Sequence, residues 1–126
     1  MYKYMKEIYR AYEDGIPLVG PTYLSNILNI SKTTAQQALK NLAKKGYGKY
    51  IERKGFIVNS KGIEEAKKII RKHRLLEAFF VEIFSLDAKE ACREASKIDI
   101  FASDDLIKLI EEKYGFTECP CGNKIP

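Results

Sequence analysis

The chain has 126 residues, a net charge of +5 and 45% hydrophobic residues, which is enough apolar content for a buried core and too little length for more than two small domains. It has neither the long apolar run of a membrane span nor a signal peptide. Its three cysteines are an odd number, and two of them lie only two positions apart, which does not favour the disulfide framework of a secreted protein. We therefore expect a globular protein of the reducing cytoplasm that does not bind membranes. Walker loops, dinucleotide-binding glycine motifs and nucleophile motifs are absent, so an enzyme is not expected.

The positive charge is concentrated in the first half of the chain. Residues 1–62 contain 11 Lys or Arg and 4 Asp or Glu, whereas residues 63–126 contain 11 and 13. The first half therefore carries +7 and the second half −2. Such an asymmetry favours a polyanionic partner, most often nucleic acid, although a lysine-rich solvated surface would show the same charge.

The first half begins with a pattern of three helices. A first helix ends at Asp14-Gly15, an extended connection follows over residues 16–19, and a second helix begins at Pro21. After a break at Asn29-Ile30, Ser31 is a natural N-cap for the third helix. Two short helices about a tight turn predict a helix-turn-helix.

The third helix has the side chains of a DNA-recognition helix. Its outer face carries amide, hydroxyl and ammonium groups, and no acid occurs between Ser31 and Lys45. A helix selected only for solubility usually mixes Glu among its lysines, so we favour base and phosphate recognition over an ordinary polar face. The expected DNA-contacting residues here are Ser31, Lys32, Thr33, Thr34, Gln36, Gln37 and Lys40.

A basic hairpin is expected directly after this helix. Residues 49–52 and 56–58 have the pattern of two strands around Arg53-Lys54-Gly55. In this position a hairpin is typical of the wing of a winged helix-turn-helix, and Arg53 and Lys54 at its tip would reach phosphate or the minor groove. A purely structural hairpin with a soluble tip is the alternative.

The second half is predicted to be helical. Ser60 is expected to cap a long helix that reaches about Phe84, and shorter helices follow Asp87 and Ser103. The buried stripe of the long helix should comprise Ala66, Ile70, His73, Glu77, Phe80 and Phe84. The fold class is therefore mainly α with a small β-hairpin, in which a winged helix-turn-helix over 1–62 precedes a helical dimerisation domain over 63–126.

Two polar residues interrupt the buried stripe of the long helix. His73 and Glu77 lie one turn apart, so their side chains meet on one face and could chelate a metal ion. A hydrogen bond between the imidazole and the carboxylate would satisfy them equally well. The sequence alone leaves both readings open.

Five short motifs are distributed over the second half of the chain and the end of the hairpin. They are Val58-Asn59-Ser60-Lys61-Gly62, Arg71-Lys72-His73-Arg74-Leu75-Leu76-Glu77, Glu94-Ala95, Ser103-Asp104 and Cys119-Pro120-Cys121-Gly122-Asn123-Lys124-Ile125-Pro126. With these motifs the chain resembles, over nearly its whole length, the iron- and manganese-dependent repressors of the diphtheria toxin repressor family. The resemblance implies a winged helix, a helical dimerisation domain with two metal sites, and metal-activated binding to a palindromic operator. Longer members add an SH3-like domain, so the chain resembles a short form.

The resemblance implies metal ligands and also a departure. The ancillary site of the family falls on His73, Glu77 and Cys92, and cysteine is a softer ligand that favours zinc over manganese. Cys119 and Cys121 could add a ligand if the tail folds back. The positions of the primary, activating site are occupied by Lys3, Ser96, Asp99 and Ile100. Since the ammonium group of Lys3 and the aliphatic side chain of Ile100 cannot coordinate a cation, this site is expected to be disabled.

The expected function is a homodimeric DNA-binding transcriptional regulator. It would take at most one divalent transition metal per chain (zinc, iron or manganese), or none, and bind double-stranded DNA at a palindromic operator. The first alternative is a DNA-binding regulator that responds to cysteine redox state. The second is a winged-helix module that binds another protein.

Overall fold

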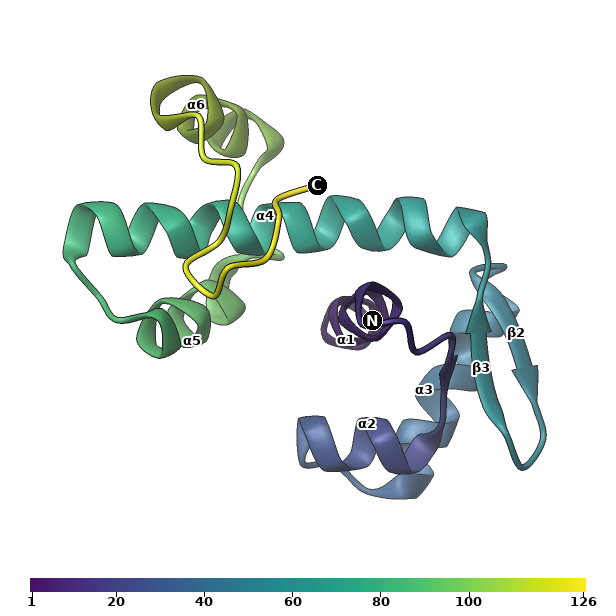
Figure 1. The fold of residues 1–126 in the computed structure, drawn as a ribbon. Helices are drawn as coiled ribbons and strands as arrows, with labels where there is room; N and C mark the ends of the chain where they lie inside the picture. The colour runs from purple at the N-terminus through teal and green to yellow at the C-terminus, as the bar shows by residue number, and fades with distance from the viewer. The chain divides into compact units, whose positions relative to one another are not determined.

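The computed structural model describes residues 1–126 and contains six helices and one small sheet (Figure 1). Two compact units divide the chain, Met1–Ala66 and Lys67–Pro126. This division falls four residues beyond the predicted boundary at 62/63, and both positions lie within the long helix that begins at Ser60. None of the six helices combines the length and the apolar character that crossing a bilayer requires.

The first unit consists of three helices and a three-stranded antiparallel sheet. The elements are α1 (Tyr2–Glu13), β1 (Leu18–Val19), α2 (Pro21–Leu28), α3 (Lys32–Lys44), β2 (Gly48–Ile51) and β3 (Gly55–Val58). The sheet order is β1-β3-β2. Phe56 of the central strand β3 therefore lies between Val19 of β1 and Tyr50 of β2. The sequence predicted no more than an extended connection over 16–19, but Leu18–Val19 forms a strand because it pairs with the open edge of β3.

The core of the first unit lies between α1, α2, α3 and the sheet. Phe56 is fully buried, as are Met5, Leu24 and Leu39 from the three helices. Gly48 lies opposite the ring of Phe56, and a side chain at Gly48 would collide with that ring and with the Ile57 carbonyl. Close approach of this strand to a core aromatic ring therefore requires glycine.

The long helix α4 (Ser60–Phe84) continues from the first unit into the second. Its cap is Asn59, whose side-chain oxygen accepts a hydrogen bond from the Gly62 N–H at 2.8 Å. The prediction of Ser60 as the cap was wrong by one residue, because both residues are good caps and the backbone decides which one precedes the first helical turn. Phe84 was expected on the buried stripe but is 60% exposed at the end of the helix.

The second unit packs two short helices and the C-terminal segment against α4. Asp87 caps α5 (Ala88–Ile98) and Ser103 caps α6 (Asp104–Tyr114), as predicted. The helix α6 ends at Gly115, which has a left-handed conformation with φ 61°. The core comprises Leu75, Leu76, Ala95, Ala102, Ile107 and Ile110, with Phe79, Phe80, Tyr114, Phe116 and Ile125 packed against it.

Candidate DNA-binding face and metal centre

The N-terminus of α3 is organised by Ser31. Its hydroxyl oxygen accepts a hydrogen bond from the Thr34 backbone N–H at 3.1 Å, and its hydroxyl donates to Thr34 Oγ1 at 2.8 Å. The side chain of Ser31 is therefore occupied by capping, and Thr34 is held by it. Lys32, Thr33 and Gln37 are exposed, whereas Ala35, Ala38, Leu39 and Leu42 are buried. The polar residues thus lie on the face of α3 that is open to solvent.

Two further predicted contact residues, Gln37 and Lys40, also have partners within the first unit. The Gln37 amide donates to Asn41 Oδ1 at 3.1 Å along the helix. The Lys40 ammonium lies 3.3 Å from a carboxylate oxygen of Glu52 and 5.5 Å from the centre of the Tyr50 ring. Lys40 is therefore half-buried against the hairpin, and the acid that accompanies it comes from β2–β3 rather than from α3 itself.

The hairpin tip is exposed and basic. Glu52, Arg53 and Lys54 connect β2 to β3, and the Lys54 N–H donates to the Ile51 carbonyl at 3.0 Å. Arg53 has φ 66°, a left-handed conformation that Gly or Asn adopts at lower cost. The turn therefore places a cationic side chain at a position where the backbone conformation favours glycine.

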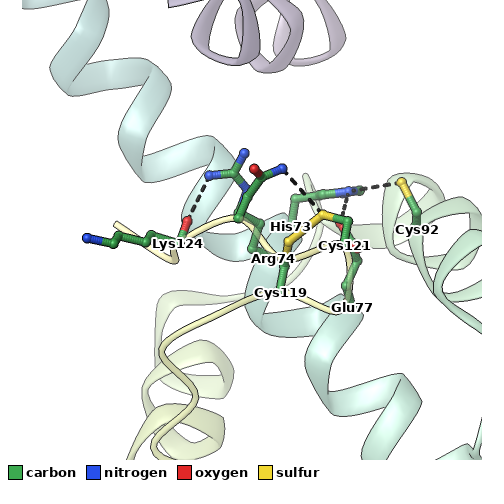
Figure 2. The surroundings of a disulfide bond; sticks show 8 residues. His73, Arg74, Glu77, Cys92, Cys119, Cys121 and Lys124 are labelled. Atoms are coloured by element: carbon green, nitrogen blue, oxygen red, sulfur yellow. Dashed lines mark hydrogen bonds and ion pairs between the residues drawn. A yellow bond between two sulfur atoms is a disulfide. The ribbon is translucent and has the colours of Figure 1, made fainter. Parts of the chain in front are cut away.

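The second unit brings the predicted metal ligands together (Figure 2). His73 and Glu77 project from α4, and Cys92 approaches from α5. His73 Nε2 lies 2.6 Å from Glu77 Oε1 and 3.5 Å from Cys92 Sγ. His73 and Glu77 are only 0% and 2% exposed. The three donor atoms lie within 4.8 Å of one another.

Asp99 completes this cluster, in a role that the sequence did not predict. Its carboxylate is almost fully buried and lies 3.0 Å from His73 Nδ1. A carboxylate on Nδ1 holds the imidazole with that nitrogen protonated and turns Nε2 toward Glu77 and Cys92. The family motif aligns Asp99 with a position of the primary site, which was expected to be disabled. The spacing of the two residues along the sequence did not indicate that Asp99 contacts His73.

The surroundings of His73 favour its protonated form when no metal is bound. Burial by itself lowers the pKa, but hydrogen bonds to Asp99, Cys92 and Glu77 and the charge of Glu77 outweigh burial and raise the pKa of His73 from 6.5 to about 9. An imidazolium between two carboxylates satisfies the buried charges. No buried side-chain nitrogen or oxygen lacks a hydrogen-bond partner, so the cluster is complete as an ion-pair network as well.

The donor set also fits a metal ion. With bond lengths of about 2.0–2.3 Å, nitrogen and sulfur ligands of a tetrahedral zinc stand about 3.5 Å apart, which matches the 3.5 Å between His73 Nε2 and Cys92 Sγ. The 2.6 Å between His73 Nε2 and Glu77 Oε1 would have to open to roughly 3.3 Å.

The C-terminal segment folds back onto α4. Arg74 donates to the Lys124 carbonyl at 2.8 Å, and residues Glu118 and Lys124 form an isolated antiparallel bridge. Cys119 and Cys121 are joined by a disulfide beside Glu77 (Figure 2). Their sulfurs and a Glu77 carboxylate oxygen lie within 4.8 Å of one another. The sequence left the position of this segment open, and a disulfide between residues two positions apart was not predicted.

The remaining positions of the primary site do not form a donor set. Ser96 is exposed and Ile100 is 42% exposed. Lys3 lies in the other unit, with its ammonium 5.3 Å from the centre of the Tyr4 ring. Asp99 is directed to His73 instead.

Family models match both halves of the chain. Residues 1–56 match the N-terminal DNA binding domain of iron dependent repressors, and residues 59–126 match their metal binding and dimerisation domain. The chain belongs to the iron-dependent repressor family. The resemblance drawn from its motifs is thereby confirmed, and so is the winged-helix fold class.

Relatives of this family member are regulators and repressors. An uncharacterized HTH-type transcriptional regulator of Methanocaldococcus jannaschii is 35% identical over 114 residues, which cover 88% of this chain and 91% of that protein. The iron-dependent repressor IdeR of Mycobacterium leprae is 29% identical over 125 residues, 98% of this chain and 54% of that protein. The chain thus spans about half the length of the curated iron-dependent repressors that it matches.

Solved structures show the same fold. A manganese-dependent transcriptional repressor in complex with manganese superposes with a TM-score of 0.90 at 29% identity, over 99% of this chain and 57% of that one. The IdeR of T. acidophilum gives 0.86 at 25% identity, over 99% and 58%. A Sulfolobus solfataricus protein at 24% identity and TM-score 0.72 shares the fold over 95% of its length.

Proposed function

We propose that this family member is a DNA-binding transcriptional regulator that binds a palindromic operator as a homodimer. The observation that carries the proposal is the pairing of an acid-free, exposed α3 face with the basic hairpin tip in a unit that matches a DNA-binding domain. Thr33, Thr34 and Gln37 would meet base edges in the major groove, with Gln36 and Lys32 beside them. Arg53 and Lys54 would contact phosphate.

Lys40 has a conditional role in this proposal. Its ammonium is paired with Glu52 in the free protein. To reach a phosphate or a guanine it would exchange a partly exposed carboxylate for DNA, and exposed ion pairs of this kind contribute little stability. Lys40 would therefore contribute to affinity only after Glu52 turns away.

The homodimer would form through α6 and the segment before it. Leu109 is 63% exposed and Phe101 is 82% exposed, while Leu106 and Ile98 are nearly half-exposed. Together they leave an apolar surface on a unit that matches a dimerisation domain. A two-fold dimer would place two recognition helices on successive turns of the major groove, which one short helix cannot span.

We propose that His73, Glu77 and Cys92 hold one divalent metal ion, with zinc favoured by the mixed nitrogen, oxygen and sulfur donors. When bound, such an ion cross-links α4 and α5. Asp99 would position His73 by keeping Nδ1 protonated, so that Nε2 is the donor. Lys3, Ser96, Asp99 and Ile100 would hold no metal.

The test of DNA binding is selection from a random duplex library, followed by affinity measurements on the enriched sequence. The proposal predicts an inverted repeat with half-site centres a whole number of helical turns apart, about 10 base pairs or a multiple. The variant Gln37→Ala should bind it more weakly and select a less defined half-site, whereas Lys89→Ala, on the exposed surface of α5, should not. If the metal-loaded protein enriches no sequence from the library, the proposal that it recognises a specific DNA sequence is wrong.

A further inference from the structure

Asn41 lies in one row with the proposed base-contacting residues of α3. Thr33, Gln37, Asn41 and the C-cap residue Lys45 are spaced four positions apart, so their side chains follow one another along one side of the helix. All four residues are exposed. Asn41 therefore faces DNA whenever Gln37 does, although the proposed base contacts do not include it.

Asn41 determines which polar groups Gln37 can offer to a base. Gln37 Nε2 donates a hydrogen bond to Asn41 Oδ1 at 3.1 Å. A primary amide has two N–H donors and one carbonyl oxygen, so this bond leaves Gln37 with one free N–H and its oxygen. One donor beside one acceptor matches the N7 acceptor and the N6 donor of adenine, whereas guanine presents two acceptors, N7 and O6. In this orientation Gln37 matches adenine.

This orientation depends on which end of the Asn41 amide faces Gln37. If the Asn41 amide were reversed, its N–H would donate to the Gln37 oxygen and leave both Gln37 N–H groups for a base, which suits guanine. The bond between the two amides is exposed, and such pairs along a helix are weak by themselves. A third group must therefore fix Asn41. A phosphate oxygen can do so, because it only accepts and thus turns the Asn41 oxygen toward Gln37.

The surroundings of Asn41 favour a phosphate. Lys44 and Lys45 follow it at the end of α3 and are exposed. Burial and the charges of Lys45 and Lys3 lower the pKa of the Met1 amino group, so cationic groups of α1 and α3 lie near one another here. Open space adjoins Asn41, because a groove of about 400 Å³ separates the two helices. Its lining residues are Tyr4, Thr33, Thr34, Gln37, Ala38 and Asn41.

We propose that Asn41 is a positioning residue that selects adenine over guanine at the base contacted by Gln37. Its NH₂ group donates to a backbone phosphate, and its oxygen accepts from Gln37 and orients the Gln37 amide. This inference rests on the proposed function, since it requires Gln37 to lie in the major groove. Asn41 thereby affects base preference although it contacts only the DNA backbone.

The experiment uses the full, zinc-loaded chain and the operator that the wild type enriches from the random library. The base contacted by Gln37 is identified as the position at which Gln37→Ala loses its preference. Fluorescence anisotropy then compares operators that carry adenine or guanine at this position in both half-sites. We expect the wild type to bind the adenine operator about tenfold more tightly, and Asn41→Ala to bind the two operators within about threefold of each other. Preferences at the other base pairs should not change in Asn41→Ala.

Two further variants separate orientation of Gln37 from a simple phosphate contact. Asn41→Asp keeps an acceptor for Gln37 but repels phosphate, so it should bind both operators more weakly and keep the wild-type preference for adenine. Lys44→Ala should also keep this preference, while it lowers the salt slope by about one unit per protomer. Asn41→Ala removes no charge and should leave the salt slope unchanged.

The outcomes distinguish this inference from the proposed function. An unchanged adenine preference in Asn41→Ala would overturn the inference and leave specific DNA binding intact. Guanine preference of the wild type at this position would contradict it equally, as would loss of the adenine preference in Asn41→Asp. A wild type that enriches no sequence would refute the proposed function itself, and the inference with it. Circular dichroism of each variant checks that it is folded.

Discussion

Asp99 offers the sharpest test of the metal centre, because its carboxylate lies 3.0 Å from His73 Nδ1 and is not one of the three proposed ligands. Replacing it with asparagine keeps the shape and a hydrogen-bond acceptor but removes the charge that keeps Nδ1 protonated. Replacing it with alanine removes the acceptor as well. Partners of a metal-bound histidine are generally worth about 10–100-fold in metal affinity.

The magnitude for Asp99 follows from its burial and charge. A hydrogen bond to a charged group contributes about 1.5–3 kcal/mol, which corresponds to about 10–150-fold in a dissociation constant. Asp99 is 3% exposed, so water would not replace it. We therefore expect zinc affinity to fall about tenfold in Asp99→Asn and toward 100-fold in Asp99→Ala.

The assay is a zinc titration against a chromophoric chelator at pH 7.5, with the tail cysteines in the disulfide form. Asp105→Asn, an exposed aspartate of α6, serves as the matched control and should bind zinc as the wild type does. His73→Ala should not bind. If both Asp99 variants keep wild-type affinity while His73→Ala loses it, Asp99 does not position the ligand.

Other expected outcomes concern DNA, assembly and pH. Gln37→Ala should cost about 1–3 kcal/mol on the selected operator and relax the preference at one base, as fluorescence anisotropy on single-base variants would show; unchanged specificity would place α3 differently. Joint replacement of Arg53 and Lys54 by alanine should weaken binding to all sequences alike and reduce the salt slope by about two units per protomer; an unchanged slope would remove the hairpin from the DNA. Leu109→Glu should yield monomers in sedimentation velocity at micromolar concentration, where the wild type should be dimeric; a monomeric wild type would refute the dimer. When a chelator keeps the protein free of metal, the raised pKa of His73 stabilises the folded state. This contribution is complete below pH 6.5 and is lost as the pH rises through about 9. Urea unfolding should therefore show the wild type losing on the order of 3 kcal/mol relative to His73→Gln over this range; parallel curves would contradict it.

Much of the fold was readable from local sequence. The caps Asp87 and Ser103 and the left-handed Gly115 mark helix ends through short-range hydrogen bonds, which depend on residues within one turn. The i, i+4 spacing of His73 and Glu77 placed them on one helix face for the same reason. Their association with Cys92, however, came from the family motif rather than from spacing, because Cys92 lies on another helix.

Only the tertiary structure showed which residues distant in the sequence contact one another. The segment at Leu18–Val19 is too short to be read as a strand, and it becomes one only because β3 offers an unpaired edge. Asp99 lies 26 residues beyond His73, and nothing in the sequence around it indicates which side chain its carboxylate faces.

The C-terminal loop shows the same limit. Its proximity to Glu77 depends on a buried arginine that binds a backbone carbonyl 50 residues away. Any residue can supply a backbone carbonyl, so the sequence does not indicate this contact. The two cysteines could therefore be recognised as possible metal ligands, but their position beside Glu77 could not be predicted. Local periodicity and capping thus determined the helices and the ligand pair on α4. The packing of α5 and of the tail on α4 determined the chemistry around that pair, because long-range contacts depend on which surfaces the folded chain buries together.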